Sequence, residues 1–279
     1  MSDIILKNIS KAYDGKQVLN HFSLTLPEGK RTCIMGPSGC GKTTLLNILT
    51  GLVKPDTGTV ENRPDRISMV FQENRLCEDF SALENVRMVA LDKTEQARAL
   101  LTRMGLAEDM MKPVSTLSGG MKRRAGIAQA MLNDPKILIL DEPTAGLDPS
   151  ERIRFRNLIS ELSEDRIVLL STHIVSDIEY IANDILLMKD GQLVISGTSE
   201  DIIDSMPESV WISRVSKNSI DYCLKKFKVS NVKTIPGGAE LRIISRKQPA
   251  ENAIQVDATL EDVFLYYFGE RAGEDDDSV

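Results

Sequence analysis

Eight residues near the start of the chain have the types and spacing of a phosphate-binding loop. Residues 36–43 read Gly-Pro-Ser-Gly-Cys-Gly-Lys-Thr, which fits G-x-x-x-x-G-K-T. Glycines let the backbone turn its N–H groups around a phosphate, and a helix N-terminus adds partial positive charge. In this pattern Lys42 reaches the β- and γ-phosphates and the Thr43 hydroxyl binds Mg²⁺. The residues expected to contact the nucleotide are Gly36, Pro37, Ser38, Gly39, Cys40, Gly41, Lys42, Thr43 and Thr44.

The segments on either side of this loop supply the context that the motif needs. The apolar run 32–35 predicts a buried strand, and residues 44–49 predict a helix that stops at Gly51. The alternative is a chance glycine turn before a helix. The order of strand, glycine loop and helix favours a nucleotide site instead.

A second strand delivers two carboxylates. The apolar run 137–140 leads directly into Asp141 and Glu142, which is typical of a central parallel strand. Ligands of α/β sheets bind at the carboxyl ends of the strands. Asp141 is therefore expected to hold Mg²⁺, directly or through water, and Glu142 to polarise an attacking water. The alternative to a metal and catalytic site is that the two acids only begin a helix at the protein surface. The upstream P-loop makes this alternative less favoured.

Two further features are weaker evidence for a nucleotide site when each is taken alone. Ser118-Gly119-Gly120 opens a helix pattern, so it is either an ordinary helix cap or a second anion site. His173 follows the apolar strand 167–171 at the same end as Asp141, which lets it reach the γ-phosphate. His21, the only other histidine, is expected to be structural.

Composition narrows the function class. The 279 residues are 42% hydrophobic and 27% charged, as in ordinary globular proteins. The net charge of −7 argues against nucleic acid as the main partner. No apolar run approaches the roughly 20 residues of a membrane span, and no signal peptide is recognisable. Four scattered cysteines fit reduced thiols in a cytosol. The chain is not expected to cross a membrane itself.

Taken in order, the motifs resemble the ATP-binding subunit of an ABC transporter across about residues 1–205. The family's Walker A motif matches residues 36–43, its glutamine after a strand matches Gln72, and its signature matches residues 117–120. Its Walker B motif matches residues 137–142, its D-loop residues 146–148 and its switch histidine His173. One position departs from the pattern, because the signature usually closes with Gln where this chain has Met121. Ser118 and the glycine backbone keep the phosphate contacts, so nucleotide binding is expected to survive without any polar contact of that Gln to the opposite nucleotide.

The resemblance implies a mechanism and partners. Two copies meet head to tail and bury two ATP molecules, each held by Walker A of one copy and by Ser118, Gly119 and Gly120 of the other. A separate membrane permease is the second partner, at the inner face of the plasma membrane. The family roles fall on Glu142 as general base, His173 as γ-phosphate sensor, Tyr13 as the ring stacked on adenine, Gln72 as the link between metal and permease, and Asp148 as a signal across the dimer. For Tyr13, packing at a strand edge is an equal alternative.

The two halves resemble different branches. Residues 68–76 and 121–124 look like importers of small oxyanions such as nitrate or sulfonates. Residues 171–179 and 260–265 look like exporters of drugs, peptides or lipids, and this longer similarity favours export. A soluble ABC ATPase acting on ribosomes or DNA, or a P-loop kinase or GTPase, fits less well.

The expected fold is α/β: a P-loop NTPase core with an antiparallel β subdomain, a helical subdomain at about 73–132 and a small C-terminal α/β extension. The domains are then 1–205 for ATP binding, 206–270 as an accessory unit and 271–279 as an acidic disordered tail. The accessory unit fits regulation, dimer support or packing, with dimer support favoured. Three local expectations are an antiparallel meander from residue 4 that leads into the P-loop strand, a turn at 55–58, and a lowered pKa for Cys40 at a helix N-terminus.

Overall fold

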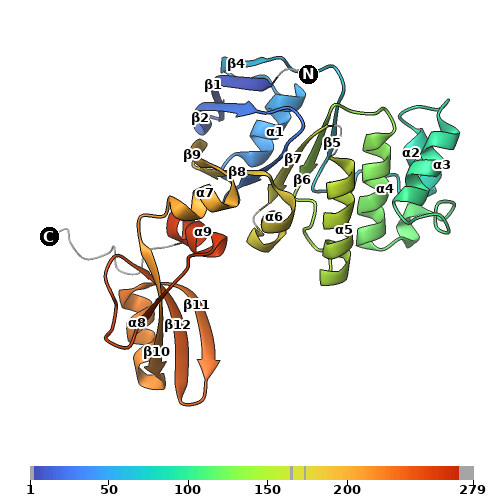
Figure 1. Ribbon diagram of the computed structural model, residues 1–279. Coiled ribbons are helices and arrows are strands. Elements are labelled where there is room, and N and C mark those ends of the chain that lie inside the picture. Colours follow the sequence, from blue (N-terminus) through green and yellow to red (C-terminus); the bar gives the residue numbers. More distant parts are fainter. Residues whose placement is uncertain (1–2, 164–165, 173, 270–279) are drawn as a thin grey trace. The chain divides into compact units, whose positions relative to one another are not determined.

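A six-stranded, mostly parallel sheet forms the centre of the N-terminal part of the chain (Figure 1). The strand order is β5-β6-β7-β3-β8-β9, and the pairs from β5 to β8 are parallel. In the register, Asp141 lies opposite Ser171 and Met35 opposite Thr172, so β6, β7 and β3 end at the same edge. The strands are β3 (Arg31–Met35), β5 (Ile67–Val70), β6 (Ile137–Asp141), β7 (Ile167–Thr172), β8 (Asp184–Lys189) and β9 (Gln192–Gly197).

This computed structural model describes residues 3–163, 166–172 and 174–269, without the side chains of 176–178. The chain divides into two units, Met1–Ser196 and Gly197–Val279. The expected tail at 271–279 lies outside the described residues. No helix in the described ranges is long and apolar enough to cross a membrane.

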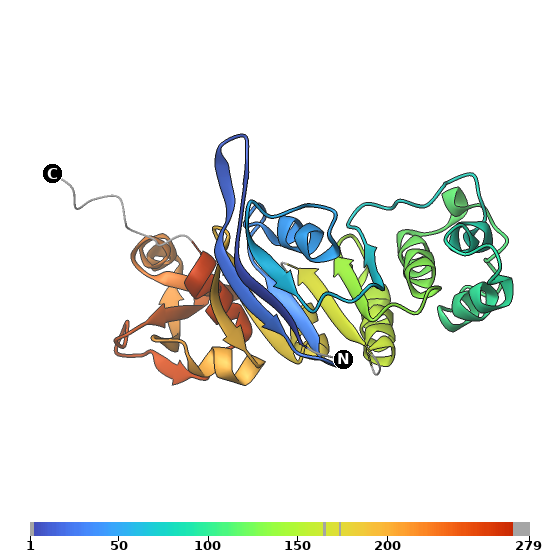
Figure 2. The same cartoon turned by 90° about the horizontal axis from the view of Figure 1, so that it is seen from above.

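A three-stranded antiparallel sheet, ordered β2-β1-β4, completes the β structure of the first unit. Its strands are β1 (Ile4–Tyr13), β2 (Lys16–Leu26) and β4 (Thr57–Glu61), and β1 and β2 form a long hairpin (Figure 2). The expected antiparallel strands that lead into the P-loop strand are confirmed, because β1 pairs with β2 antiparallel before β3 joins the parallel sheet. The expected turn at 55–58 is wrong in part. Thr57 and Gly58 already belong to β4, where Gly58 has φ +90° and passes too close to the Lys7 carbonyl for a side chain.

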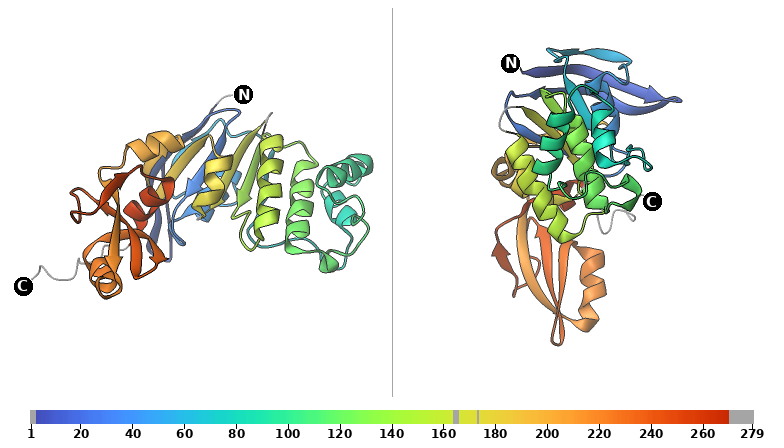
Figure 3. Two further views of the ribbon diagram at one scale, coloured as in Figure 1. Left: turned by 60° about the horizontal axis from the view of Figure 1, so that its bottom comes forward. Right: turned by 90° about the vertical axis from the view of Figure 1, so that its right-hand side faces the viewer.

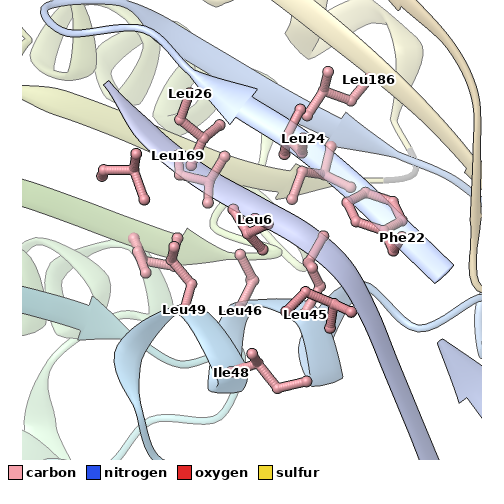
Figure 4. Close-up of a cluster of buried hydrophobic side chains, with 14 of the residues drawn as sticks. Leu6, Phe22, Leu24, Leu26, Leu45, Leu46, Ile48, Leu49, Leu169 and Leu186 are labelled. Atoms are coloured by element: carbon pink, nitrogen blue, oxygen red, sulfur yellow. The ribbon is translucent and has the colours of Figure 1, made fainter. Parts of the chain in front are cut away.

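The main core lies between the antiparallel sheet, helix α1 (Lys42–Thr50) and one face of the parallel sheet (Figure 4). Leu46 and Leu49 of α1 point toward Leu6 of β1 and Leu169 of β7. Leu46 and Leu49 are at most 1% exposed. Since α1 starts directly after the glycine loop, burial of its apolar face fixes the loop against the sheet.

The remaining helices of the first unit fall into two groups. Helices α5 (Pro149–Leu162) and α6 (Val175–Ile181) contact each other beside the parallel sheet. Helices α2 (Ala82–Arg87), α3 (Thr94–Arg103) and α4 (Gly119–Met131) pack together, and a short 3₁₀ turn, η1 (Val114–Thr116), precedes α4. Ser81 and Glu84 form a capping box at the start of α2, with both reciprocal bonds present.

The C-terminal unit is an antiparallel sheet of order β11-β12-β10-β13 with short helices (Figure 3). Cys223 of α8 packs on Leu241 and Ile243 of β12, and α9 contacts α7 and β11. The elements are α7 (Ser199–Asp204), β10 (Ser209–Ser216), η2 (Lys217–Ser219), α8 (Ile220–Lys226), β11 (Lys228–Ile235), β12 (Gly238–Ser245), β13 (Ile254–Val256) and α9 (Leu260–Phe268).

One buried carboxylate ties this unit together. Asp262 in the first turn of α9 is 1% exposed and accepts from Arg242 Nη2 at 2.7 Å, Ser230 Oγ at 2.6 Å and Thr259 N at 2.8 Å. Burial opposes ionisation of Asp262, but these donors outweigh it and hold its pKa below the usual range. The ionised carboxylate therefore holds α9 onto β11 and β12.

We expect Asp262→Asn to destabilise the C-terminal unit by about 2–3 kcal/mol at pH 7, the scale of hydrogen bonds to a charged group. Because the pKa of Asp262 is lower folded than unfolded, this stabilisation is present above about pH 4 and is lost as the pH falls through the folded-state pKa. The gap between variant and wild type should thus shrink in acid.

Trp211, the only tryptophan, lies on β10 and reports unfolding of this unit by its fluorescence in urea. The matched control is Asp221→Asn, at an exposed position of α8. A pH-independent gap, or an equal loss in the control, would contradict the assigned role of Asp262.

Candidate functional site

The glycine loop is shaped by close backbone contacts that leave no room for side chains. A Cβ at Gly36 would lie 2.3 Å from the Met188 carbonyl oxygen of β8. Gly41 has φ +107° and would meet the Val18 carbonyl at 2.8 Å. The Cys40 carbonyl accepts from Gly191 N at 3.0 Å, in the turn between β8 and β9. The loop is thus held between β2 and the β8–β9 turn, in front of the N-terminus of α1.

Lys42 is anchored at this loop and lies beside Glu142. It is 7% exposed, and its ammonium donates to the Gly36 carbonyl at 2.7 Å and the Pro37 carbonyl at 3.2 Å. Its Nζ is 3.7 Å from Glu142 Oε1. A buried ammonium at the start of a helix produces a strongly positive site for anions.

Thr43 at the start of α1, Asp141 at the end of β6 and Ser171 near the end of β7 form a hydrogen-bonded chain. Thr43 Oγ1 donates to Asp141 Oδ2 at 3.1 Å, and Ser171 Oγ donates to Asp141 Oδ1 at 2.5 Å. Asp141 is 3% exposed. A hydroxyl and a carboxylate are hard oxygen donors of the kind Mg²⁺ prefers, and Mg²⁺ takes its remaining ligands from water and phosphate oxygens. The residues present therefore fit a magnesium ion held together with a nucleotide.

Glu142 is held in an uncommon backbone conformation. Its φ is +45°, which few residues other than glycine adopt. Its N–H contacts both the carbonyl oxygen (3.1 Å) and Oγ (3.0 Å) of Ser171, and the residue is 7% exposed. Strained backbone of this kind is concentrated at functional sites. At the end of β6, the carboxylate of Asp141 therefore accepts a hydrogen bond from Thr43, whereas the carboxylate of Glu142 lies beside Lys42.

Other residues expected at the nucleotide lie on separate elements. Gln72 follows β5 with an exposed side chain, and its carbonyl accepts from Arg123 Nη2 at 3.4 Å. Tyr13 is at the end of β1, 43% exposed, with Lys11 Nζ 5.5 Å from its ring centre. His173 lies outside the described residues.

The Ser-Gly-Gly segment and Asp148 start two neighbouring helices. Ser118 caps α4 and accepts from Met121 N at 3.2 Å, while Asp148 caps α5 and accepts from Glu151 N at 2.9 Å. Glu151 also pairs with Arg124 of α4. Hydrogen bonds from the Glu151 backbone N–H and from the Ser150 hydroxyl lower the pKa of Asp148. Ser118, Gly119 and Asp148 are exposed, so these helix starts face outward.

The expected lowering of the Cys40 pKa is wrong. Cys40 is 5% exposed, and burial raises the pKa of its thiol more than the nearby Lys42 charge and backbone donors lower it. Desolvation of the buried thiol disfavours the thiolate and outweighs the effect of the helix N-terminus. Cys40 is therefore a packing residue under the loop, in contact with the main core.

Two residues at the site were missed from sequence. Ser171 interrupts the apolar strand β7, and a hydroxyl among buried aliphatics was the available signal. Arg123 donates to the carbonyls of Phe71, Gln72, Glu142 and Pro143. Nothing in its local sequence indicates those partners, because they come from two distant loops.

This geometry defines a P-loop nucleotide-binding protein of the α/β class. Comparison with known proteins identifies the family within this class. The family model described as "ABC transporter" matches residues 19–145. The lantibiotic transport ATP-binding protein SrtF of Streptococcus pyogenes is 36% identical over 202 residues, covering 68% of this chain and 88% of that protein.

Two further relatives carry names with opposite directions of transport. The Nod factor export ATP-binding protein I of Burkholderia orbicola (strain AU 1054) is 33% identical over 224 residues, 74% of each chain. The aliphatic sulfonates import ATP-binding protein SsuB 3 of Pseudomonas savastanoi pv. phaseolicola is 36% identical over 200 residues, 68% of this chain and 74% of that protein.

Solved structures of ABC transporter subunits are also similar to this chain. The cassette MJ0796, a dimer bound to ADP and Pi after hydrolysis, has a TM-score of 0.64 and 30% identity, covering 70% of this chain and 98% of that chain. CbiO1 from Clostridium perfringens, part of the transporter complex cbiONQ, has a TM-score of 0.67 and 28% identity, covering 72% and 90%. The chain belongs to the ABC transporter family as an ATP-binding subunit, and it is an ATPase.

Proposed function

We propose that this subunit powers a membrane permease by forming a head-to-tail dimer that encloses two ATP molecules. The observation that carries the proposal is the division of anion-binding features between two surfaces. Lys42, Thr43 and Asp141 are joined at the P-loop, while Ser118 and Gly119 start a helix that faces outward. A nucleotide on the P-loop of one copy would then be completed by the Ser118 helix start of the other.

In this proposal the residues of the P-loop bind and orient ATP. Lys42 exchanges its bonds to the Gly36 and Pro37 carbonyls for the β- and γ-phosphates. Thr43 and Asp141 would hold Mg²⁺, which neutralises charge on the phosphates when bound. Tyr13 stacks on the adenine, and Asp148 signals across the dimer.

Glu142 is the proposed general base. Its carboxylate lies at the strand end beside Lys42, where it can accept a proton from water that attacks the γ-phosphate. The bond of its N–H to Ser171 fixes the direction of the side chain. His173 would sense the γ-phosphate, and Gln72 would link the metal site to the permease.

We further propose export as the direction of transport, with residues 1–205 as the ATP-binding domain at the inner face of the plasma membrane. The exporter-like segments at 171–179 and 260–265 support this, and the relative named for Nod factor export matches a longer stretch than the sulfonate importer. Import of a small oxyanion is the second candidate. For residues 206–270 we propose dimer support; a chain ending at 205 that dimerises as tightly as the full chain would remove that role.

Gly119→Ala tests the shared site. A Cβ at Gly119 meets nothing within 4 Å in its own chain, so the variant should keep its thermal stability and its ATP affinity as a monomer. If the Gly119 backbone approaches a nucleotide on the opposite copy, the added methyl should lower ATPase activity about 100-fold, the scale of an ångström-level misplacement. Steady-state ATPase and calorimetric ATP titration measure both. Unchanged ATPase activity would contradict the shared site.

Purification of the subunit from native membranes in mild detergent tests the partner and the direction. We expect a polytopic membrane protein to co-purify, without a soluble binding protein encoded beside it. A permease accompanied by such a binding protein would indicate import. Absence of any membrane protein would contradict the transport role in this chain.

A further inference from the structure

Arg123 joins the two loops that carry Gln72 and Glu142. It lies on the second turn of α4, and its guanidinium reaches four backbone carbonyls. Nη1 donates to Phe71 O at 2.5 Å and Nε to Pro143 O at 3.2 Å. Nη2 lies 2.9 Å from Glu142 O and 3.4 Å from Gln72 O. The same nitrogen thus contacts the backbone of both residues.

The position of these loops in the sheet explains why one side chain can reach them. Phe71 and Gln72 follow β5, and Glu142 and Pro143 follow β6. Strands β5 and β6 pair in parallel with Val70 opposite Leu140, so both loops leave the same edge. The planar guanidinium has five N–H donors in a fixed fork, whereas the lysine ammonium is a compact group that cannot span two loops.

Two carboxylates lie near the Arg123 guanidinium. Burial lowers the pKa of Arg123 below its usual range, and the nearby Asp141 and Glu142 carboxylates oppose this shift in part. A guanidinium remains charged at neutral pH even so. Its removal would leave four carbonyl oxygens without this donor and would take away one cation near the two carboxylates, although Lys42 would remain beside Glu142.

We propose that Arg123 is a positioning residue for ATP hydrolysis, which sets the backbone of Glu142 relative to that of Gln72 and links both to the helix that starts at Ser118. The proposal rests on the role proposed above for Glu142. All four acceptors lie outside residues 36–44, so the guanidinium acts on the hydrolysis step and leaves nucleotide binding at the P-loop unaffected.

The test compares turnover per bound nucleotide in full-length Arg123→Lys, the matched control Arg66→Lys and wild type. Arg66 pairs with Asp134 at the surface, its side chain 51% exposed. We expect Arg123→Lys to lower kcat per ATP-occupied site by about 10-fold or more, with the Kd for Mg-ATP within about twofold. The control should match wild type. A merely structural role would lower the number of occupied sites instead and leave turnover per occupied site unchanged.

Chemical rescue provides a second readout. In Arg123→Ala, millimolar methylguanidinium should restore part of the turnover per occupied site, and NaCl at the same ionic strength should not. Unchanged turnover in Arg123→Lys, or loss of turnover only in step with ATP occupancy, overturns the proposal, as does an Arg123→Ala variant that methylguanidinium fails to rescue.

Glu142→Gln separates this inference from its premise. If Glu142→Gln hydrolyses ATP at the wild-type rate, the proposed base is wrong and the inference about Arg123 falls with it. If Glu142→Gln is inactive while Arg123→Lys turns over normally, only the inference about Arg123 fails.

Discussion

The common edge at which β3, β6 and β7 end is the constraint on which the site depends. Parallel pairing brings the P-loop, Asp141 and Ser171 to that edge, although more than 90 residues separate Thr43 from Asp141. The Ser171 hydroxyl then connects the two acids, since it donates to Asp141 and contacts the N–H of Glu142. A shift of β7 by one residue would move Ser171 to the other face of the sheet and break both contacts.

Residues with local signals were predictable from sequence. The spacing of the glycine loop, the apolar strand before Asp141 and the helix cap at Ser118 depend on neighbours within a few residues, and the structure has the loop, strand and helix there. The family resemblance also anticipated the fold, which the solved structures confirm. Roles that need a second copy or a bound nucleotide stay predictions.

What could not be predicted depends on distant contacts. Gly58 has the sequence context of a turn, but pairing of β4 with β1 places it in a strand. Cys40 has the helix N-terminus expected to favour a thiolate, but the core beneath it excludes water and raises the thiol pKa. Arg123 finds its carbonyl partners only because the fold brings the loops after β5 and β6 together. In each case tertiary packing outweighs a local preference.

Completion of the ATP site by a second copy is the central claim, and the mass of the Glu142→Gln variant tests it most directly. With the proposed base removed and binding retained, ATP should accumulate between two subunits. Light scattering of the purified variant should give a monomer without nucleotide and a dimer with saturating Mg-ATP, stable over the measurement because hydrolysis is blocked. A mass that stays monomeric at saturating Mg-ATP, with bound ATP verified, would contradict the claim.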